Sequence, residues 1–144
     1  MNRSIELERV VRFYETMDAA TLHERLAGTY ATDASFKDPF NEVRGRAAIE
    51  RIFSHMFQQV NNPRFKVVTG IQQENQAFVT WEFAFQMKRF STEVQCIRGA
   101  SQLVFDGDGA VQLHRDYWDA AEELYEKIPV LGAFMKMLKR SAAR

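Results

Sequence analysis

Tyr30-Ala-Thr-Asp-Ala-Ser-Phe-Lys-Asp-Pro39 decides the fold, because it carries the two-residue period of a strand directly after a helical segment. Ala34, Phe36 and Asp38 share one parity within it, and polar side chains stand between them. Successive side chains of a strand point to opposite faces, so Ala34 and Phe36 face the core and bring Asp38 to the same side. Pro39 then stops further pairing in a sheet.

Two interpretations of Asp38 follow from this stretch. An acid delivered to an apolar interior resists ionisation, which makes it a candidate general base or general acid. Asp-Pro pairs also favour turns at the protein surface. The residues of this stretch alone leave both interpretations open.

Length and composition indicate a single folded domain. The 144 residues suffice for one core, and a hydrophobic content of 46% with 12 Phe excludes disorder. Basic and acidic side chains cancel at 19 each, so no nucleic-acid partner is expected. The polar N-terminal stretch lacks the apolar region of a signal peptide and Cys96 has no disulfide partner, so we expect a cytoplasmic protein.

Outward from residue 30, the chain divides into a helical half and a strand half. Apolar residues at helical spacing predict helices over residues 5–17, 20–28 and 46–60. The period then changes to two and predicts strands over residues 64–73, 77–89, 93–105 and 110–118. Residues 119–141 are predicted to be helical again, with a break at Pro129.

Helices followed by long antiparallel strands indicate an α+β fold. Strands of this length must twist and curl, so we predict a cone-shaped, curved antiparallel sheet closed by the three N-terminal helices. Such a sheet encloses a pocket. We assign residues 1–120 to this domain and residues 121–144 to a C-terminal helical extension packed on it.

The last strand carries the strongest candidates for chemistry. His114, Asp116 and Trp118 share one parity, and Leu113 and Tyr117 share the other. A His and an Asp two residues apart on a concave wall can share a proton, which general acid–base catalysis exploits. Periodicity alone also allows the opposite arrangement, with Leu113 and Tyr117 facing the core.

Other chemical groups are sparse. His23 and His55 fall off the apolar stripes of their helices, so we expect both to be solvated. Cys96 is interpreted as a small strand hydrophobe. His114-x-Asp116 is only half of a metal site, and no metal is predicted.

Four motifs carry a resemblance to a known superfamily. They are residues 30–39, Gly45-Arg-Ala-Ala-Ile49, Phe105-Asp-Gly-Asp-Gly109 and Tyr117-Trp118, in matching order over nearly all of the chain up to about residue 120. Together they resemble the ketosteroid isomerase and SnoaL-like branches of the nuclear transport factor 2-like superfamily. The resemblance implies the same cone-shaped fold and a homodimer. It does not specify the chemistry, because that superfamily includes isomerases, cyclases, epoxide hydrolases, dehydratases and non-catalytic binding modules.

The resemblance also implies roles for individual residues. Asp38 stands where the isomerases keep the carboxylate that moves a proton beside a carbonyl, and Tyr30 matches a family tyrosine. Trp118 matches an aromatic residue that lines the pocket, which places His114 and Asp116 inside the cone. SnoaL-like cyclases resemble this arrangement in using a His and an Asp as acid–base groups.

The chain departs from the isomerases at the oxyanion hole, which in that family needs a protonated Asp and a Tyr. Ser101 stands at the Asp position, and Phe53 replaces a supporting tyrosine. The Tyr position falls on Phe13 or Tyr14, and we favour Tyr14 because it lies at the centre of an apolar stripe. Losing one donor typically lowers the rate by about 10²–10³, so steroid isomerisation itself is not expected.

The tail extends beyond the motifs that carry the resemblance. Leu131, Phe134, Met135 and Leu138 form an apolar stripe with basic residues beside it. The pattern is typical of a helix that packs over the cone or onto a dimer partner. Its basic, amphipathic character leaves contact with a membrane surface open.

Two functional hypotheses follow. The first is an acid–base isomerase, cyclase or hydrolase without cofactor or metal, whose hydrophobic pocket takes a polyketide-, terpenoid- or steroid-like molecule. Its site residues are Asp38, His114 and Asp116 for proton exchange, Tyr14, Tyr30 and Ser101 as hydrogen-bond donors, and Phe53, Trp81, Phe83, Phe85 and Trp118 as apolar walls. The second is a non-catalytic module that binds an apolar ligand in the cone or docks a partner through the tail.

Overall fold

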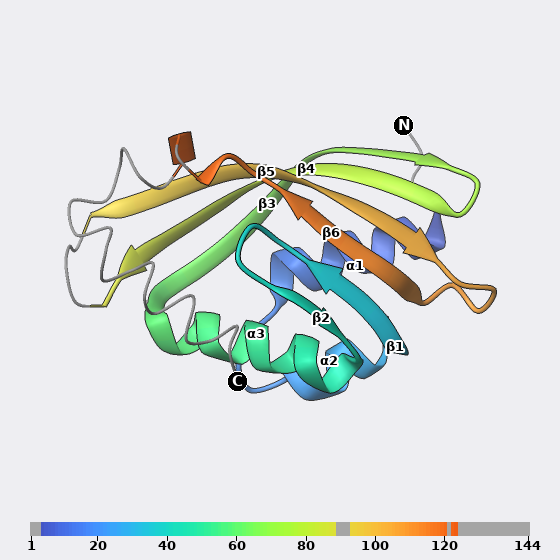
Figure 1. Cartoon of the computed structure of the whole chain (residues 1–144). Helices are drawn as coiled ribbons and strands as arrows, with labels where there is room; N and C mark the ends of the chain where they lie inside the picture. Colours follow the sequence, from blue (N-terminus) through green and yellow to red (C-terminus); the bar gives the residue numbers. More distant parts are fainter. Residues whose placement is uncertain (1–3, 89–92, 121, 124–144) are drawn as a thin grey trace.

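The chain folds into a curved β-sheet with helices on its concave side, as Figure 1 shows for the computed structural model. The structure describes residues 4–88, 93–120, 122 and 123. In chain order the elements are α1 (Ile5–Thr16), α2 (Leu22–Ala27), β1 (Tyr30–Lys37), β2 (Glu42–Arg44), α3 (Arg46–Gln59), β3 (Val60–Gln73), β4 (Gln76–Met87), β5 (Val94–Phe105) and β6 (Val111–Tyr117). This order confirms the predicted α+β class. No helix in the described ranges is long and apolar enough to cross a membrane.

Local sequence explains where two of the helices begin. Ser4 caps α1, because its Oγ accepts a hydrogen bond from the backbone N–H of Leu7 at 3.1 Å. Gly45 precedes α3 with φ of +102°, a backbone conformation that other residues rarely adopt. The Gly45 N–H donates to the Ala34 carbonyl at 2.8 Å, so the chain turns into α3 while it stays attached to β1.

The strands of the described residues form one open sheet in the order β2-β1-β6-β5-β4-β3. Neighbouring strands are antiparallel except β1 and β6, which run parallel. The sheet is therefore mixed, where the sequence predicted antiparallel pairing throughout. Alternating polarity identifies the buried face of a strand, but it carries no information on the direction of a neighbour that lies far away in the sequence.

Two further details of the sheet differ from the prediction. β3 begins at Val60 rather than at residue 64 and runs through Pro63. The β3–β4 register shifts between Asn61 and Arg64, so Pro63 lies in an irregularity where its missing N–H breaks no regular ladder. The strand β2 was not predicted, because its three residues cannot show a period.

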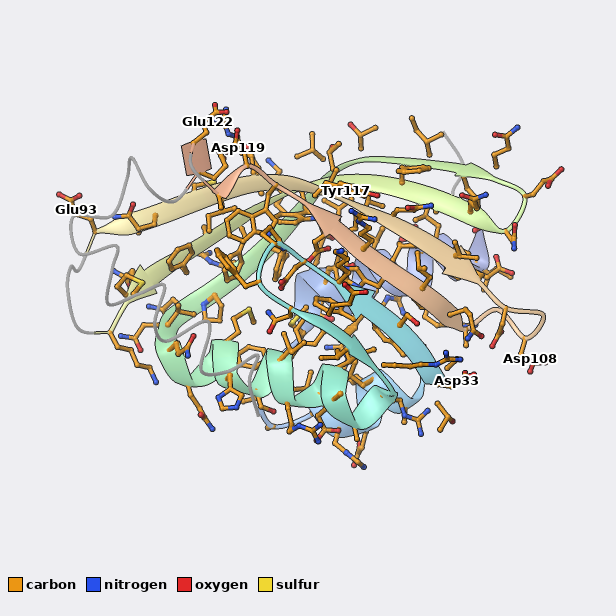
Figure 2. The ribbon with its side chains drawn as sticks, in the orientation of Figure 1. Asp33, Glu93, Asp108, Tyr117, Asp119 and Glu122 are labelled. Atoms are coloured by element: carbon orange, nitrogen blue, oxygen red, sulfur yellow. The ribbon has the colours of Figure 1, made fainter. Side chains whose placement is uncertain are left out.

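The core lies between the concave face of the sheet and the helices, where Figure 2 shows side chains filling the space. Along β4, alternate side chains are buried as the sequence predicted, namely Ala77, Val79, Trp81, Phe83, Phe85 and Met87. α1 covers this face with Leu7, Val10, Val11, Phe13 and Tyr14. Ile49 and Phe53 do the same on α3.

The predicted C-terminal helical extension lies outside the described residues, apart from its first positions. Glu123 is buried, and its Oε1 accepts hydrogen bonds from the backbone N–H of Arg98 at 2.7 Å and from Arg98 Nε at 2.9 Å. β6 ends at Tyr117, so this carboxylate satisfies a backbone N–H of β5 beyond the end of its partner strand. Glu123 is thereby attached to the sheet.

Gly99 permits a close approach between side chains of β4 and β5. It stands opposite Trp81 in the strand register, and a Cβ atom at Gly99 would lie 2.5 Å from the Trp81 ring. Without that atom the indole lies across β5, where its Nε1 donates to Ser101 Oγ at 2.8 Å. The position of Trp81 in the core therefore depends on a glycine.

We expect Gly99→Ala to displace the Trp81 ring and to lower the free energy of unfolding by about 1–3 kcal/mol, because overpacking forces side chains out of their preferred rotamers. Urea titration measures the stability, and Trp fluorescence reports the displacement. Gly107→Ala is the matched control, since a Cβ atom there meets nothing within 4 Å. Equal effects of the two substitutions would contradict the close approach.

Candidate active site

A pocket of about 140 Å³ lies between the concave face of the sheet and α3. An engineered cavity of about 150 Å³ holds one benzene molecule, so this space fits a group of that size. Its lining is mostly aromatic and aliphatic, with two carboxylates among the polar groups. The described lining residues are Phe36, Asp38, Phe40, Asn41, Ile52, Phe53, His55, Met56, Gln59, Val60, Phe65, Trp81, Phe83, Phe85, Ile97, Asp116 and Trp118.

Asp38 closes a turn at the end of β1 and also lines the pocket. Its Oδ1 accepts hydrogen bonds from the backbone N–H groups of Phe40 at 2.8 Å and Asn41 at 2.6 Å. Asn41 Nδ2 donates to Oδ1 at 3.0 Å and to Oδ2 at 3.1 Å. Both interpretations of Asp38 therefore apply: it initiates a turn, and it presents an acid to an apolar wall. Oδ2 keeps most of its capacity to accept a proton.

The surroundings of Asp38 disfavour its charge. Burial raises the pKa of this carboxyl above its ordinary value of 3.8, and the nearby Asp116 charge raises it further. The hydrogen bonds from Phe40 and Asn41 act in the opposite direction and are outweighed. A carboxyl with a raised pKa is a stronger base once ionised, which suits proton transfer near neutral pH.

The parallel pairing of β1 with β6 brings the second carboxylate to the same place. The register sets Phe36 beside His114 and Lys37 beside Arg115. Asp38 and Asp116 each follow this last pair by one residue, and both line the pocket. Because the strands run in the same direction and in phase, both carboxylates reach the concave side together.

Asp116 is 17% exposed, and one of its two oxygens is held by two side chains. His114 Nε2 lies 2.5 Å from Oδ1, and Ser101 Oγ donates to the same oxygen at 2.5 Å. Within the described part of the chain, every hydrogen bond to this carboxylate goes to Oδ1. Oδ2 therefore remains available to a molecule in the pocket.

His114 lies behind Asp116, only 2% exposed, between two tyrosine hydroxyls. The Tyr30 hydroxyl is 2.6 Å from Nδ1, and the Tyr14 hydroxyl is 2.9 Å from Nε2. An ionised carboxylate can only accept, so Nε2 carries a proton toward Asp116. The Tyr30 hydroxyl donates to Nδ1, so the contacts of the two ring nitrogens fix the tautomer.

Both tyrosines stay protonated donors. Burial raises the pKa of Tyr30, and the Asp116 charge raises it further. Burial also raises the pKa of Tyr14 well above 10.0, with added repulsion from Tyr30 and Asp116. Together with the Trp81-to-Ser101 bond, these contacts form one buried set of hydrogen-bonded side chains, which we call the Asp116 network: Tyr14, Tyr30, Trp81, Ser101, His114 and Asp116.

The two parities of β6, both open from the sequence, differ clearly in burial. His114 is buried, and Asp116 and Trp118 line the pocket. Tyr117, of the other parity, is 45% exposed and lies on the side of the sheet away from the helices (Figure 2). The arrangement with His114 and Asp116 inside is therefore the one the chain adopts.

The structure divides the predicted site residues into two groups. Those that line the pocket are Asp38, Phe53, Trp81, Phe83, Phe85, Asp116 and Trp118. Those outside the described lining are Tyr14, Tyr30, Ser101 and His114, whose polar side-chain atoms bond within the Asp116 network. The three hydroxyls expected to reach a substrate therefore hold His114 and Asp116 instead.

Tyr14, rather than Phe13, reaches the Asp116 network. Both side chains are buried. Phe13 packs on Phe53 and Tyr30, with ring centroids 5.8 Å apart in each pair. The sequence left open which of the two faces the pocket, and neither belongs to the described pocket lining.

Sequence reasoning missed Phe40, Asn41 and His55 on the pocket wall. The turn preference of Asp38-Pro39 was the available signal for the first two, because a carboxylate that opens a turn binds the N–H groups two and three residues later. Asn41 Oδ1 is buried and has no hydrogen-bond partner in the part of the chain that the structure describes. His55 was expected to be solvated, but it is half-buried, since the pocket borders α3 beyond its apolar stripe.

The other sequence candidates lie away from the pocket. His23 is exposed as expected, with Nδ1 2.6 Å from Glu50 Oε1. Among residues 4–88, 93–120, 122 and 123, no group of three or more His, Cys, Asp or Glu side chains is arranged to hold a metal ion.

Comparisons with known proteins agree with this architecture. Residues 10–114 match the model of the SnoaL-like domain. Among solved structures, a protein with a ketosteroid isomerase-like fold from Catenulispora acidiphila, in complex with trimethylamine, has a TM-score of 0.72 at 13% identity, over 86% of this chain and 92% of that chain. An M.tuberculosis LEH-like epoxide hydrolase has a TM-score of 0.70 at 14% identity, over 93% of each chain.

A third similar structure is a candidate SnoaL-like polyketide cyclase from Jannaschia, with a TM-score of 0.70 at 14% identity, over 96% of this chain and 97% of that chain. No curated protein sequence matches the chain. The structural likeness confirms the fold that the sequence motifs implied, and the matched model confirms the SnoaL-like resemblance.

Asp38 gives the folded protein a characteristic pH dependence. Since its folded pKa is raised above 3.8, the folded state binds this proton more tightly than the unfolded chain does. That stabilisation is fully present below the unfolded pKa and is lost as pH rises through the folded pKa. The side chain of Asn cannot ionise, so the Asp38→Asn variant does not share this loss of stability. We therefore expect the difference between the two free energies of unfolding, variant minus wild type, to increase from about pH 4 to about pH 7.

Denaturant titrations over this pH range measure the difference. Asp108→Asn controls for the change of charge, because Asp108 lies at the exposed tip of the β5–β6 hairpin (Figure 2). A difference for Asp38→Asn that stays constant or falls with pH contradicts the raised pKa.

Proposed function

Because the chain belongs to the SnoaL-like domain family, we propose that it is an acid–base enzyme that moves protons on a small apolar molecule bearing a carbonyl or an epoxide. One observation carries the proposal: Asp38 and Asp116 open onto the same, largely apolar pocket from unlike environments. Pairs of acids whose surroundings differ can divide the roles of base and acid between them. Isomerisation, cyclisation and hydrolysis all need this division.

Asp38 is the proposed base. Its Oδ1 is occupied by N–H donors, which hold the carboxylate rigid, whereas Oδ2 accepts only from Asn41 among the described residues. The raised pKa of the Asp38 carboxyl makes it a stronger acceptor than an exposed carboxylate. It would take a proton from a carbon beside a carbonyl, or from a water that attacks an epoxide.

Asp116, backed by His114, is the proposed acid. The pair shares a proton between Nε2 and Oδ1, and Oδ2 faces no protein partner in the described residues. In its protonated form, with the proton on Oδ2, Asp116 would donate a hydrogen bond or that proton to the substrate oxygen as negative charge develops there. Tyr30 and Ser101 act as positioning residues, because they bond His114 and Asp116 rather than the substrate.

A second candidate is a non-catalytic module that binds a small molecule in the hydrophobic pocket. It is favoured by the absence of Tyr, Ser and Thr from the described pocket lining, which leaves no neutral hydroxyl to stabilise an oxyanion. The two candidates predict different outcomes in one experiment. Ligand addition stabilises the folded state of either, but only an enzyme converts the ligand.

A thermal-shift panel of small apolar enones and epoxides tests the proposal, followed by mass spectrometry of the bound compounds. A ligand present at about 100 times its Kd stabilises the folded state by roughly 2.7 kcal/mol. For a compound that is converted, we expect Asp38→Asn and Asp116→Asn each to lower kcat by about 10²–10⁴, because each removes one proton-transfer group.

Asp108→Asn is the control that should retain the wild-type rate. Wild-type rates in both pocket variants would overturn the proposed roles, and circular dichroism separates loss of activity from loss of fold. Binding without conversion across the panel would favour the non-catalytic module.

We also propose that two copies pair through the outer face of the sheet. Ile71 and Phe78 are cross-strand neighbours on β3 and β4, and they are 56% and 49% exposed. Adjacent exposed apolar side chains mark a surface that associates. The resemblance of the sequence motifs to a usually dimeric superfamily supports a second copy as the partner.

Phe78→Glu is expected to convert the dimer to a monomer, because it places a charge in the apolar centre of the interface. Light scattering after size exclusion measures the change from twice the chain mass to once that mass. Gln102→Glu, which adds a charge at the neighbouring β5 position, should perturb pairing less. A wild-type protein that is monomeric at all concentrations contradicts the pairing.

A further inference from the structure

The charge of the pocket wall is entirely acidic. Asp38 and Asp116 are the only described lining residues that carry a formal charge at neutral pH when His55 is neutral, and none of the described lining residues is Lys or Arg. The chain as a whole balances 19 basic side chains against 19 acidic ones. The local excess of negative charge is therefore a property of the fold rather than of the composition.

The nearest basic side chains on the same strands point to the other face. Lys37 precedes Asp38 and pairs with Glu42 at 3.2 Å. Arg115 precedes Asp116 and stacks over the Tyr117 ring at 4.8 Å. In the described residues, neither pocket carboxylate forms an ion pair with Lys or Arg, so both charges are left for a ligand to neutralise.

Two aromatic rings flank these carboxylates. Phe40 lies two residues after Asp38, and Trp118 lies two residues after Asp116. Their ring centroids are 5.5 Å apart at an interplanar angle of 66°. We call these four residues the acidic corner. Phe and Trp faces attract cations through the ring quadrupole, and the attraction grows where water is excluded.

Most of the remaining wall also consists of aromatic faces. Phe65 packs edge-on against Trp81 at 5.4 Å and stacks on Phe83 at 4.4 Å, and Phe83 stacks on Phe85 at 5.1 Å. A pocket of about 140 Å³ with such walls fits a compact group, such as an ammonium with small alkyl substituents. An isolated cation would be costly to desolvate there, but unpaired carboxylates and ring faces offset that cost.

We propose that the acidic corner binds a small organic cation, an ammonium carried on an apolar group, in preference to a neutral molecule of the same shape. The cation belongs to the ligand of the pocket described above, so the inference rests on the proposed function and names its substrate class: an amine-bearing molecule. An anion of the same shape is excluded by the two carboxylates. A bound cation also favours the ionised form of Asp38, so the base starts deprotonated.

Three isosteric probes test this preference without any turnover. They are choline, neutral 3,3-dimethylbutan-1-ol, and anionic 3,3-dimethylbutanoate. Both Trp residues of the chain, Trp81 and Trp118, line the pocket, so Trp fluorescence reports its occupancy and calorimetry gives the Kd. We expect choline to bind roughly tenfold tighter than the alcohol, and the butanoate to bind least.

Two variants separate the contribution of carboxylate charge to the preference for choline from the contribution of the aromatic rings. Asp38→Asn should lower the choline-to-alcohol affinity ratio, because it removes one of the two carboxylate charges, and Phe40→Leu should lower choline affinity while it spares the alcohol. Asp108→Asn leaves the pocket untouched and should keep the wild-type ratio. Since Phe40→Leu retains apolar bulk, it keeps the test decisive even where a change at Asp38 disturbs the turn.

Equal affinities for choline and the alcohol in the wild type, or no measurable binding of choline, overturn the inference. Cation preference without conversion of any amine-bearing ketone or epoxide overturns the proposed catalysis and leaves the inference standing. Conversion of neutral compounds, with no preference for choline, overturns the inference and leaves the proposed catalysis standing. The two failures are therefore distinguishable.

Discussion

The candidate site depends on one buried hydrogen bond, between His114 Nε2 and Asp116 Oδ1. A polar pair in an apolar interior is tolerated only when its remaining donors and acceptors are satisfied. Here Tyr30 occupies the far nitrogen of the imidazole, and Ser101 occupies the same carboxylate oxygen from the other side. Trp81 supports Ser101 in turn and can do so only because Gly99 leaves room for its ring. The Asp116 network, which also includes Tyr14, thus links five elements of the fold, α1, β1, β4, β5 and β6, and it leaves one oxygen of Asp116 for the pocket.

The parallel pairing of β1 with β6 is the second constraint, because it decides where the two carboxylates meet. An antiparallel partner would carry its side chains past β1 in the opposite direction, and Asp38 and Asp116 would stand level only by chance of register. In the parallel arrangement, the alternation that buries Phe36 and His114 also delivers both acids to the same end of the pocket. Their environments then differ, since Asp38 is bound by N–H groups of its own turn and Asp116 by side chains of the core.

The same alternation separates charges of opposite sign. Lys37 and Arg115 lie between the inward-facing residues, so they are directed to the outer face and find partners there. The acids on the inner face are left with aromatic neighbours and no basic side chain in the described lining. A low-dielectric wall strengthens every charge that it holds, whether that charge transfers a proton or attracts a cation. The proposed proton transfer by the two carboxylates and the proposed selection of an amine-bearing ligand therefore rest on the same arrangement.

The sequence by itself determined the fold class, most of the long helices and strands, and the buried faces of β1 and β4. These properties depend on near neighbours, because helical and strand periods repeat within a few residues. It identified Asp38, and through Trp118 it indicated which side of β6 faces inward. It also supplied the motifs that placed the chain in its family.

Only the tertiary structure decided that β1 and β6 run parallel, that Tyr14 and Tyr30 bind His114 instead of a substrate, and that Phe40, Asn41 and His55 line the pocket. Each of these facts joins residues that lie far apart in the chain or depends on a turn whose shape the packing selects. A period in the sequence reports which face of an element is buried. It cannot report which distant side chain meets that face, because that choice is made by packing and hydrogen-bond satisfaction over the whole core.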